Sequence, residues 1–156
     1  MKQVGIIGWR GMVGSVLLQR MVEENDFRDI SAHFFSTSSA GTVGPTIDGE
    51  SYILKDANSV SELADMDIII TCQGGDYTKA IYPALITHGW QGYWIDAASA
   101  LRMDEKACII LDPVNRTHID RAIHQGLKLF VGGNCSITLS LMGLAGLLKA
   151  DLVEWM

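Results

Sequence analysis

Near the N-terminus stands the sequence Val4-Gly5-Ile6-Ile7-Gly8-Trp9-Arg10-Gly11-Met12-Val13-Gly14. Its apolar residues 4–7 predict a short strand, its glycines predict a tight turn, and the residues that follow, to about Glu24, predict a helix. Glycines let a backbone approach a pyrophosphate, and a helix N-terminus offers N–H donors to it. In the order strand, turn, helix, this G-x-x-G-x-x-G pattern therefore indicates nucleotide binding. A tight turn without a ligand is the alternative.

The rest of the chain alternates between predicted strands and helices. Strands are predicted at 30–35, 51–55, 67–72, 93–96, 108–111 and 127–131, and helices at 59–64, 77–88, 115–124 and 137–148. The segment 67–72 has the β-branched, apolar composition of a strand buried on both faces. This alternation predicts an α/β fold with a Rossmann-like, doubly wound and mostly parallel sheet.

Two further turns are candidates for contacts with the cofactor. The second strand ends in Ser36-Thr37-Ser38-Ser39, where an acidic residue would select the free 2′-hydroxyl of NAD. Hydroxyl groups stand there instead, and Arg10 is placed to reach a 2′-phosphate, so we predict NADP; a plain turn is the alternative. The strand 67–72 leads into Gln73-Gly74-Gly75-Asp76, which we expect to form a wall of the cofactor site, with Cys72 in the core or in that wall.

The sequence Gly132-Gly133-Asn134-Cys135-Ser136 places a cysteine between a predicted strand and an apolar helix. The N-terminus of a helix stabilises a thiolate, so Cys135 is the candidate nucleophile. Asn134 is suited to capping the helix or to holding a polar substrate group. The alternative is an inert, buried thiol.

Arg102 follows a strand end and the small residues 97–100. A guanidinium group in such a place is suited to bidentate binding of phosphate, and an exposed, solubilising arginine is the alternative.

Composition restricts the partners. The chain has 156 residues, a formal net charge of −6, 48% hydrophobic and 19% charged residues, which describes a compact protein that binds a small molecule rather than nucleic acid. Its three cysteines match no zinc or disulfide spacing, which suits a reducing cytoplasm and predicts no metal site. No segment predicts a membrane span or a signal peptide. The residues 151–156 resemble the start of a strand, so we expect the chain to be part of a longer protein.

Several long motifs in the same order resemble the N-terminal part of bacterial aspartate-β-semialdehyde dehydrogenases of the Gram-negative type. The resemblance extends over essentially the whole chain. The motifs are Gly8-Trp9-Arg10-Gly11-Met12-Val13-Gly14-Ser15, Thr71-Cys72-Gln73-Gly74-Gly75-Asp76-Tyr77, Gly92-Tyr93-Trp94-Ile95-Asp96-Ala97-Ala98-Ser99, Leu111-Asp112-Pro113-Val114-Asn115 and Gly132-Gly133-Asn134-Cys135.

The resemblance implies a reversible, NADP- and phosphate-dependent conversion of L-aspartate 4-semialdehyde to L-4-aspartyl phosphate through a cysteine thioester. Biosynthesis of lysine, methionine and threonine runs it in the reductive direction. By match of motif, Cys135 is similar to the nucleophile, and Arg102 and Asn134 resemble residues that contact phosphate. The residues similar to NADP contacts are Gly8, Arg10, Gly11, Met12, Val13, Thr37, Ser38 and Gln73.

The resemblance also implies two domains and a homodimer. Residues 1–134 correspond to the NADP-binding domain of a two-domain dehydrogenase, and residues 135–156 to the start of a catalytic and dimerisation domain, with the nucleophile helix and the beginning of a strand. The general base and the arginine that holds the substrate carboxylate belong to later parts of that family's chains. We therefore expect the 156-residue chain alone to be inactive or nearly so. An N-acetyl-glutamyl-phosphate reductase and a non-catalytic dinucleotide-binding module are the alternatives.

Overall fold

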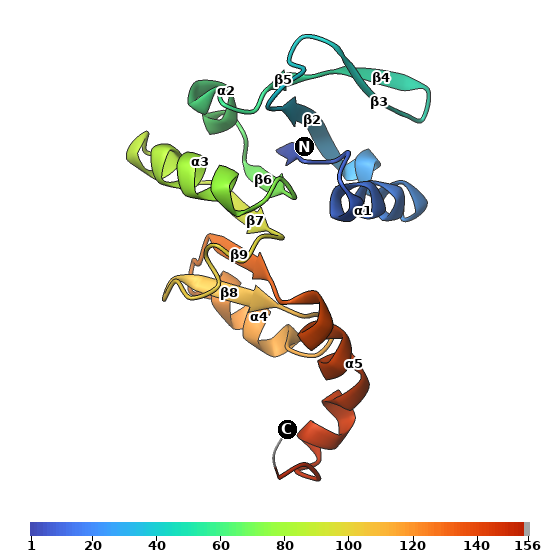
Figure 1. Ribbon diagram of the computed structural model, residues 1–156, viewed down its shortest axis with the longest axis vertical. Coiled ribbons are helices and arrows are strands. Elements are labelled where there is room, and N and C mark those ends of the chain that lie inside the picture. The colour runs from blue at the N-terminus through green and yellow to red at the C-terminus, as the bar shows by residue number, and fades with distance from the viewer. Residues whose placement is uncertain (155–156) are drawn as a thin grey trace.

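The computed structural model describes residues 1–154, and its centre is a seven-stranded parallel sheet with the strand order β5-β2-β1-β6-β7-β9-β8 (Figure 1). The strands are β1 (Lys2–Ile7), β2 (Ile30–Ser36), β5 (Lys55–Asp56), β6 (Ile68–Thr71), β7 (Tyr93–Asp96), β8 (Ala107–Ile110) and β9 (Leu129–Gly132). The chain adds β2 on one side of β1 and later returns to add β6 on the other side. The predicted Rossmann-like, doubly wound sheet is therefore confirmed, and its order reverses between β1 and β6.

Helices cover both faces of the sheet. Those that pack on it are α1 (Met12–Glu23), α2 (Val60–Ala64), α3 (Gly75–Thr87) and α4 (Arg116–His124); the chain also forms α5 (Cys135–Lys149) and a short 3₁₀ helix at Asp26–Asp29. Because side chains alternate along a strand, Ile6 lies on the face packed by α1, while Ile7 lies on the face packed by α2 and α3. In the same way, α4 packs on Ile95 and Phe130, on the face that α1 covers at the other end of the sheet.

The segment between β2 and β6 differs from the prediction. One strand was expected at 51–55, whereas the chain forms an antiparallel hairpin of β3 (Val43–Ile47) and β4 (Glu50–Ile53), and then the separate strand β5. Leu54, between β4 and β5, is 2% exposed, and its backbone bonds to Gly41 and Thr42, whereas the next residue, Lys55, pairs with β2. The hairpin strand at Val43–Ile47 has no counterpart in the sequence prediction.

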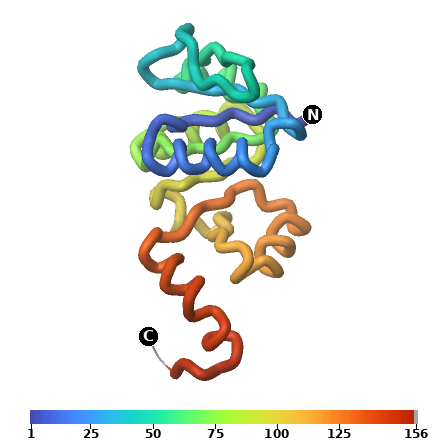
Figure 2. Tube along the Cα trace, turned by 90° about the vertical axis from the view of Figure 1, so that its right-hand side faces the viewer, coloured from blue at the N-terminus to red at the C-terminus, as the bar shows by residue number. Residues whose placement is uncertain are grey.

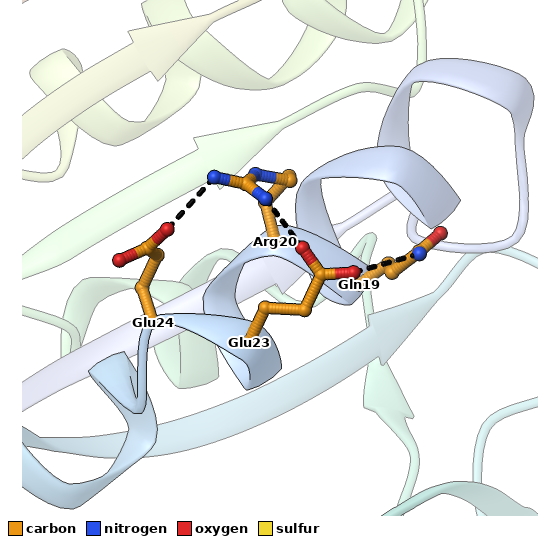
Figure 3. Close-up of polar contacts among 4 residues, drawn as sticks. All are labelled: Gln19, Arg20, Glu23 and Glu24. Carbon is orange, nitrogen blue, oxygen red and sulfur yellow. Dashed lines mark hydrogen bonds and ion pairs between the residues drawn. The ribbon is translucent and has the colours of Figure 1, made fainter.

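The end of α1 carries a small group of polar contacts (Figure 3). Arg20 contacts Glu23 and donates to Glu24 at 2.7 Å, and Gln19 donates to Glu23 at 2.8 Å. The hydrogen bond from Gln19, followed by that from Arg20, lowers the pKa of Glu23. These exposed contacts lie one helical turn apart and reinforce the last turn of α1.

The last helix, α5, runs away from the sheet (Figures 1 and 2). It ends at Lys149 with a left-handed residue, Asp151, and the N–H groups of Asp151 and Leu152 bond back to Leu148 and Leu147. This is a Schellman motif, which uses the backbone donors that a strand would need. The strand expected to begin at Asp151 is accordingly not formed over residues 151–154, and positions 155–156 of that prediction lie outside the described residues. Within residues 1–154, no helix combines the length and the apolarity needed to cross a membrane.

We expect Gly14→Ala to destabilise the fold by about 1–3 kcal/mol, because an overpacked backbone contact must move. A Cβ atom at Gly14 would lie 2.6 Å from Trp9 Cα and would collide with the carbonyl oxygen of Gly8. Gly143→Ala in α5 is the matched control: a Cβ there meets nothing within 4 Å, so the substitution should not lower stability. Urea unfolding followed by tryptophan fluorescence measures both. Equal effects of the two substitutions would contradict the close approach of α1 to the first turn.

Candidate active site

A cavity of about 290 Å³ lies where the strand order reverses, at the carboxyl ends of β1, β2 and β6. Ligands of open α/β sheets bind at this point of the topology. The cavity is lined by Gly8, Trp9, Arg10, Gly11, Phe35, Ser36, Thr37, Ser38, Cys72 and Gln73. Six of the eight residues that the sequence marks for the cofactor are among them. The other two, Met12 and Val13, begin α1 and are 85% and 56% exposed.

The groups around this cavity suit an anionic ligand. Arg10 stacks on Trp9, with its Cζ 5.0 Å from the ring centroid, and Trp9 in turn packs edge-on against Phe34 in the core. Gln73 donates from Nε2 to the Thr37 hydroxyl at 3.4 Å, so the loops after β2 and β6 meet across the opening. The described residues that line this cavity include no aspartate or glutamate.

The backbone completes this donor set. Gly11 is the N-cap of α1, and no side chain caps that helix, so the first N–H groups of α1 remain available to an anion. Gly8 has a φ of +76°, and a Cβ atom there would lie 2.6 Å from the backbone of Cys72 and Gln73. Only glycine therefore allows the turn after β1 to lie against the turn after β6.

The residue Cys135 is the first of α5 and is exposed. Asn134 caps this helix, since its Oδ1 accepts the N–H groups of Ser136 at 3.0 Å and Ile137 at 3.2 Å. The sequence allowed two roles for Asn134, and the structure shows the capping role. Its amide nitrogen takes no part in the cap.

The guanidinium group of Arg102 is half-buried beside the turn that leads to Cys135. Its Nε donates to the Gly132 carbonyl at 2.7 Å and its Nη2 to the Gly133 carbonyl at 3.0 Å. The structure thus brings Arg102, Asn134 and Cys135 together at the same edge of the sheet as the cavity. The exposed, solubilising arginine that the sequence left as the alternative is wrong, because Arg102 is half-buried.

Two other features of the site are not singled out from the sequence. Phe35, near the end of β2, lines the cavity, whereas the sequence of residues 30–35 predicts only a strand there. Asp96, at the end of β7, is 1% exposed, and its side chain accepts hydrogen bonds from three groups. The one signal for Asp96 was an acidic residue that directly ends an apolar strand.

A larger cavity of about 650 Å³ lies on the face of the sheet that α4 covers. Its walls include Ile68, Tyr93, Ile95 and Phe130 and are almost entirely apolar, so they offer few donors to a pyrophosphate. The smaller polar cavity therefore fits a nucleotide better. Nowhere in residues 1–154 do three histidine, cysteine or acidic side chains form a group that could hold a metal ion.

Comparisons with known proteins identify relatives of the chain. Residues 3–122 match the family model described as semialdehyde dehydrogenase, NAD binding domain. The structure of aspartate semialdehyde dehydrogenase from Francisella tularensis is similar, with 52% sequence identity and a TM-score of 0.95 over 99% of this chain. This chain covers 43% of that protein, so it spans less than half of its length.

More distant structures share the fold. Aspartate semialdehyde dehydrogenase II from Vibrio cholerae, complexed with ASA, has 21% identity and a TM-score of 0.77, with 96% of this chain and 47% of that chain covered. Aspartate semialdehyde dehydrogenase with NADP from Candida albicans has 18% identity and a TM-score of 0.71, with the same coverages of 96% and 47%. At these identities the likeness shows the fold alone.

The three cysteines should differ in reactivity. Burial raises the pKa of the Cys72 thiol, and the negative charge of Asp96 raises it further; burial also raises the pKa of Cys108. Since the thiolate is the reactive form, we expect Cys135 to react with iodoacetamide at pH 7 at least about tenfold faster than either. The reaction of Cys72 should accelerate as the pH rises above about 8.5, toward its raised pKa.

Mass spectrometry of peptides from timed alkylation measures the three rates separately. Alkylation in denaturant is the control, because unfolding should make the rates similar. If Cys135 reacted no faster than Cys72 or Cys108 in the folded protein, its interpretation as the nucleophile would lose its support.

Proposed function

The chain belongs to the semialdehyde dehydrogenase family through its NAD-binding domain, and on that premise we propose that it supplies the cofactor site and the nucleophile of an NADP- and phosphate-dependent aspartate-semialdehyde dehydrogenase. The reaction is the interconversion of L-aspartate 4-semialdehyde and L-4-aspartyl phosphate. One observation carries this proposal. An exposed cysteine at a helix N-terminus and a half-buried arginine lie at the same edge of the sheet as a polar cavity, which is at the point where open α/β sheets bind their ligands.

The donor set of the cavity fits a nicotinamide dinucleotide phosphate. The uncapped N-terminus of α1 is suited to the pyrophosphate, and the serine and threonine hydroxyls after β2 are suited to the ribose. Among residues 1–154, the walls of the cavity beside Arg10 contain no acidic side chain that would compete with a 2′-phosphate, which supports NADP over NAD. We assign Gly8, Arg10, Gly11, Met12, Val13, Thr37, Ser38 and Gln73 to this cofactor.

The chemical steps that belong to this chain centre on Cys135. Its Sγ attacks the aldehyde carbon and forms a thiohemiacetal, whose developing oxyanion lies at the positive end of the α5 dipole, since the N–H groups of Ser136 and Ile137 already bond to Asn134 Oδ1. The nicotinamide, when bound, supplies the hydride acceptor that turns this adduct into a thioester. Arg102 and the free amide of Asn134 hold phosphate, an oxygen of which attacks the thioester carbonyl; the C–S bond breaks and the thiolate is restored.

The wider setting follows from the same proposal. We assign residues 1–134 to the cofactor domain and residues 135–156 to the start of a catalytic and dimerisation domain. The enzyme would act as a homodimer in the cytoplasm, on the route to lysine, methionine and threonine. Three unpaired cysteines support a reducing compartment, and the exposed apolar side chains of α5, such as Leu139 and Met142, suit coverage by further protein.

The proposal is tested on the protein expressed from its full gene. We expect NADP reduction with L-aspartate 4-semialdehyde that requires phosphate, and a loss of at least about a thousandfold in kcat for Cys135→Ser, as is typical when a nucleophile is removed. Cys108→Ala, which removes a buried thiol in β8, is the control and should retain turnover. A preference for N-acetyl-glutamate semialdehyde, or turnover by Cys135→Ser at the normal rate, would refute the proposal.

Cofactor selectivity is a separate prediction. Arg10→Ala should weaken NADP binding by about tenfold or more, because a charge-assisted contact to the 2′-phosphate is lost, and should change NAD binding by less than about twofold. Titration of cofactor fluorescence measures both dissociation constants. Arg28→Ala is the matched control, since Arg28 is an exposed arginine that contacts Asp29 outside the cavity. Equal weakening of NADP and NAD by Arg10→Ala would assign Arg10 to the pyrophosphate instead.

A further inference from the structure

The side chain of Asp96 is buried at the end of β7 without a cationic partner in the described part of the chain. It is held by three hydrogen bonds: from Thr78 Oγ1 at 2.7 Å, from Trp94 Nε1 at 3.3 Å and from the N–H of Ala98 at 2.7 Å. A buried carboxyl group is costly unless such donors satisfy it. The three donors come from α3, from β7 and from the loop after β7.

Two of these donors lie near the start of segments that contribute to the candidate active site. Thr78 lies in the first turn of α3, four residues after Gly74 and just beyond Gln73 in the cavity wall. The Thr78 hydroxyl also lies 3.2 Å from the Gly74 carbonyl, but it has one proton, and the shorter contact with Asp96 takes it. Ala98 lies in the loop that leads from β7 to Arg102. Asp96 therefore joins the cofactor turn to this loop.

The loop after β7 is joined in turn to the nucleophile. Arg102 at its end donates to the carbonyls of Gly132 and Gly133, the latter two residues before Cys135, and its Nη2 also lies 3.4 Å from the Ala97 carbonyl. These bonds use Nε and Nη2, which leaves the remaining face of the guanidinium for a ligand. The direction of that face depends on the loop 97–101 and hence on the bond from Ala98 to Asp96.

We propose that Asp96 and Thr78 are positioning residues for the anion site formed by Arg102 beside Cys135. This inference rests on the proposed function, because it names what orients the phosphate-binding arginine. Asp96 touches neither cofactor nor phosphate; it fixes the loop 97–101 against the first turn of α3 and so sets the distance between Arg102 and Cys135.

The experiment measures how inorganic phosphate protects Cys135 from iodoacetamide in the protein expressed from its full gene. We expect Thr78→Val, which keeps the shape of the side chain and removes its donor, to raise the phosphate concentration for half-protection by about fivefold or more. Asp96→Asn should do the same. Thr78→Ser keeps the hydroxyl and loses a methyl group, so it should stay within about twofold of the wild type.

A matched control lies on the same helix. Tyr77 donates its hydroxyl to the Ala57 carbonyl at 2.7 Å, away from Asp96, so Tyr77→Phe also removes a hydrogen bond of α3. It should leave the half-protection concentration unchanged. Thermal unfolding of each variant reports any general loss of stability, and the comparison of Thr78→Val with Thr78→Ser stands even if Asp96→Asn fails to fold.

The outcomes distinguish a failure of the proposed function from a failure of this inference. No protection of wild-type Cys135 by phosphate would overturn the proposed function and this inference with it. Protection of the wild type with equal half-protection concentrations in Thr78→Val and Thr78→Ser would overturn the inference alone. A larger effect of Thr78→Ser than of Thr78→Val would also overturn it, because packing rather than the hydrogen bond would then hold the loop.

Discussion

The candidate site depends on the parallel pairing of β1, β6, β7 and β9. Parallel strands end at the same edge of a sheet, so the turns that follow them, although far apart along the chain, meet there. The close contact of Gly8 with the backbone of Cys72 and Gln73 holds the first two turns together. Without that contact the cavity would lose one of its walls.

A second constraint is the buried carboxyl group of Asp96, for which residues 1–154 provide no cationic partner. Hydrogen bonds from Thr78, Trp94 and Ala98 take the place of an ion pair. Because hydrogen bonds are directional and a buried carboxyl group tolerates few alternatives, such a group specifies one arrangement of the segments around it. Burial raises the pKa of the neighbouring Cys72 thiol, and the negative charge of Asp96 raises it further. Cys135 is therefore the cysteine best placed for nucleophilic chemistry.

The two sides of the site differ in how they are supported. The cofactor side rests on the core, since Arg10 stacks on Trp9 and Trp9 packs against Phe34, which is fully buried. The nucleophile side rests on polar contacts, namely the cap by Asn134 and the bonds of Arg102, while α5 itself buries none of its residues. Stacked aromatic groups and buried apolar surface hold a backbone more strongly than exposed polar contacts do.

The sequence by itself determined the order of strands and helices outside the segment 43–56, the glycine turn at Gly8 and the place of Cys135 at the start of α5, and it offered the cap as one of two roles for Asn134, because these are local patterns of a few residues. It also carried the motifs that connect the chain with its family. Only the tertiary structure decided which donors hold Asp96, that Arg102 bonds to Gly132 and Gly133, that the segment after β2 becomes a hairpin, and that Asp151 closes a helix rather than opening a strand. The contacts of Thr78 with Asp96 and of Arg102 with Gly132 and Gly133 join residues 18, 30 and 31 positions apart, and the rest depend on how a few residues are packed or capped. Short-range propensity cannot specify either, whereas burial and hydrogen bonding in the folded chain can.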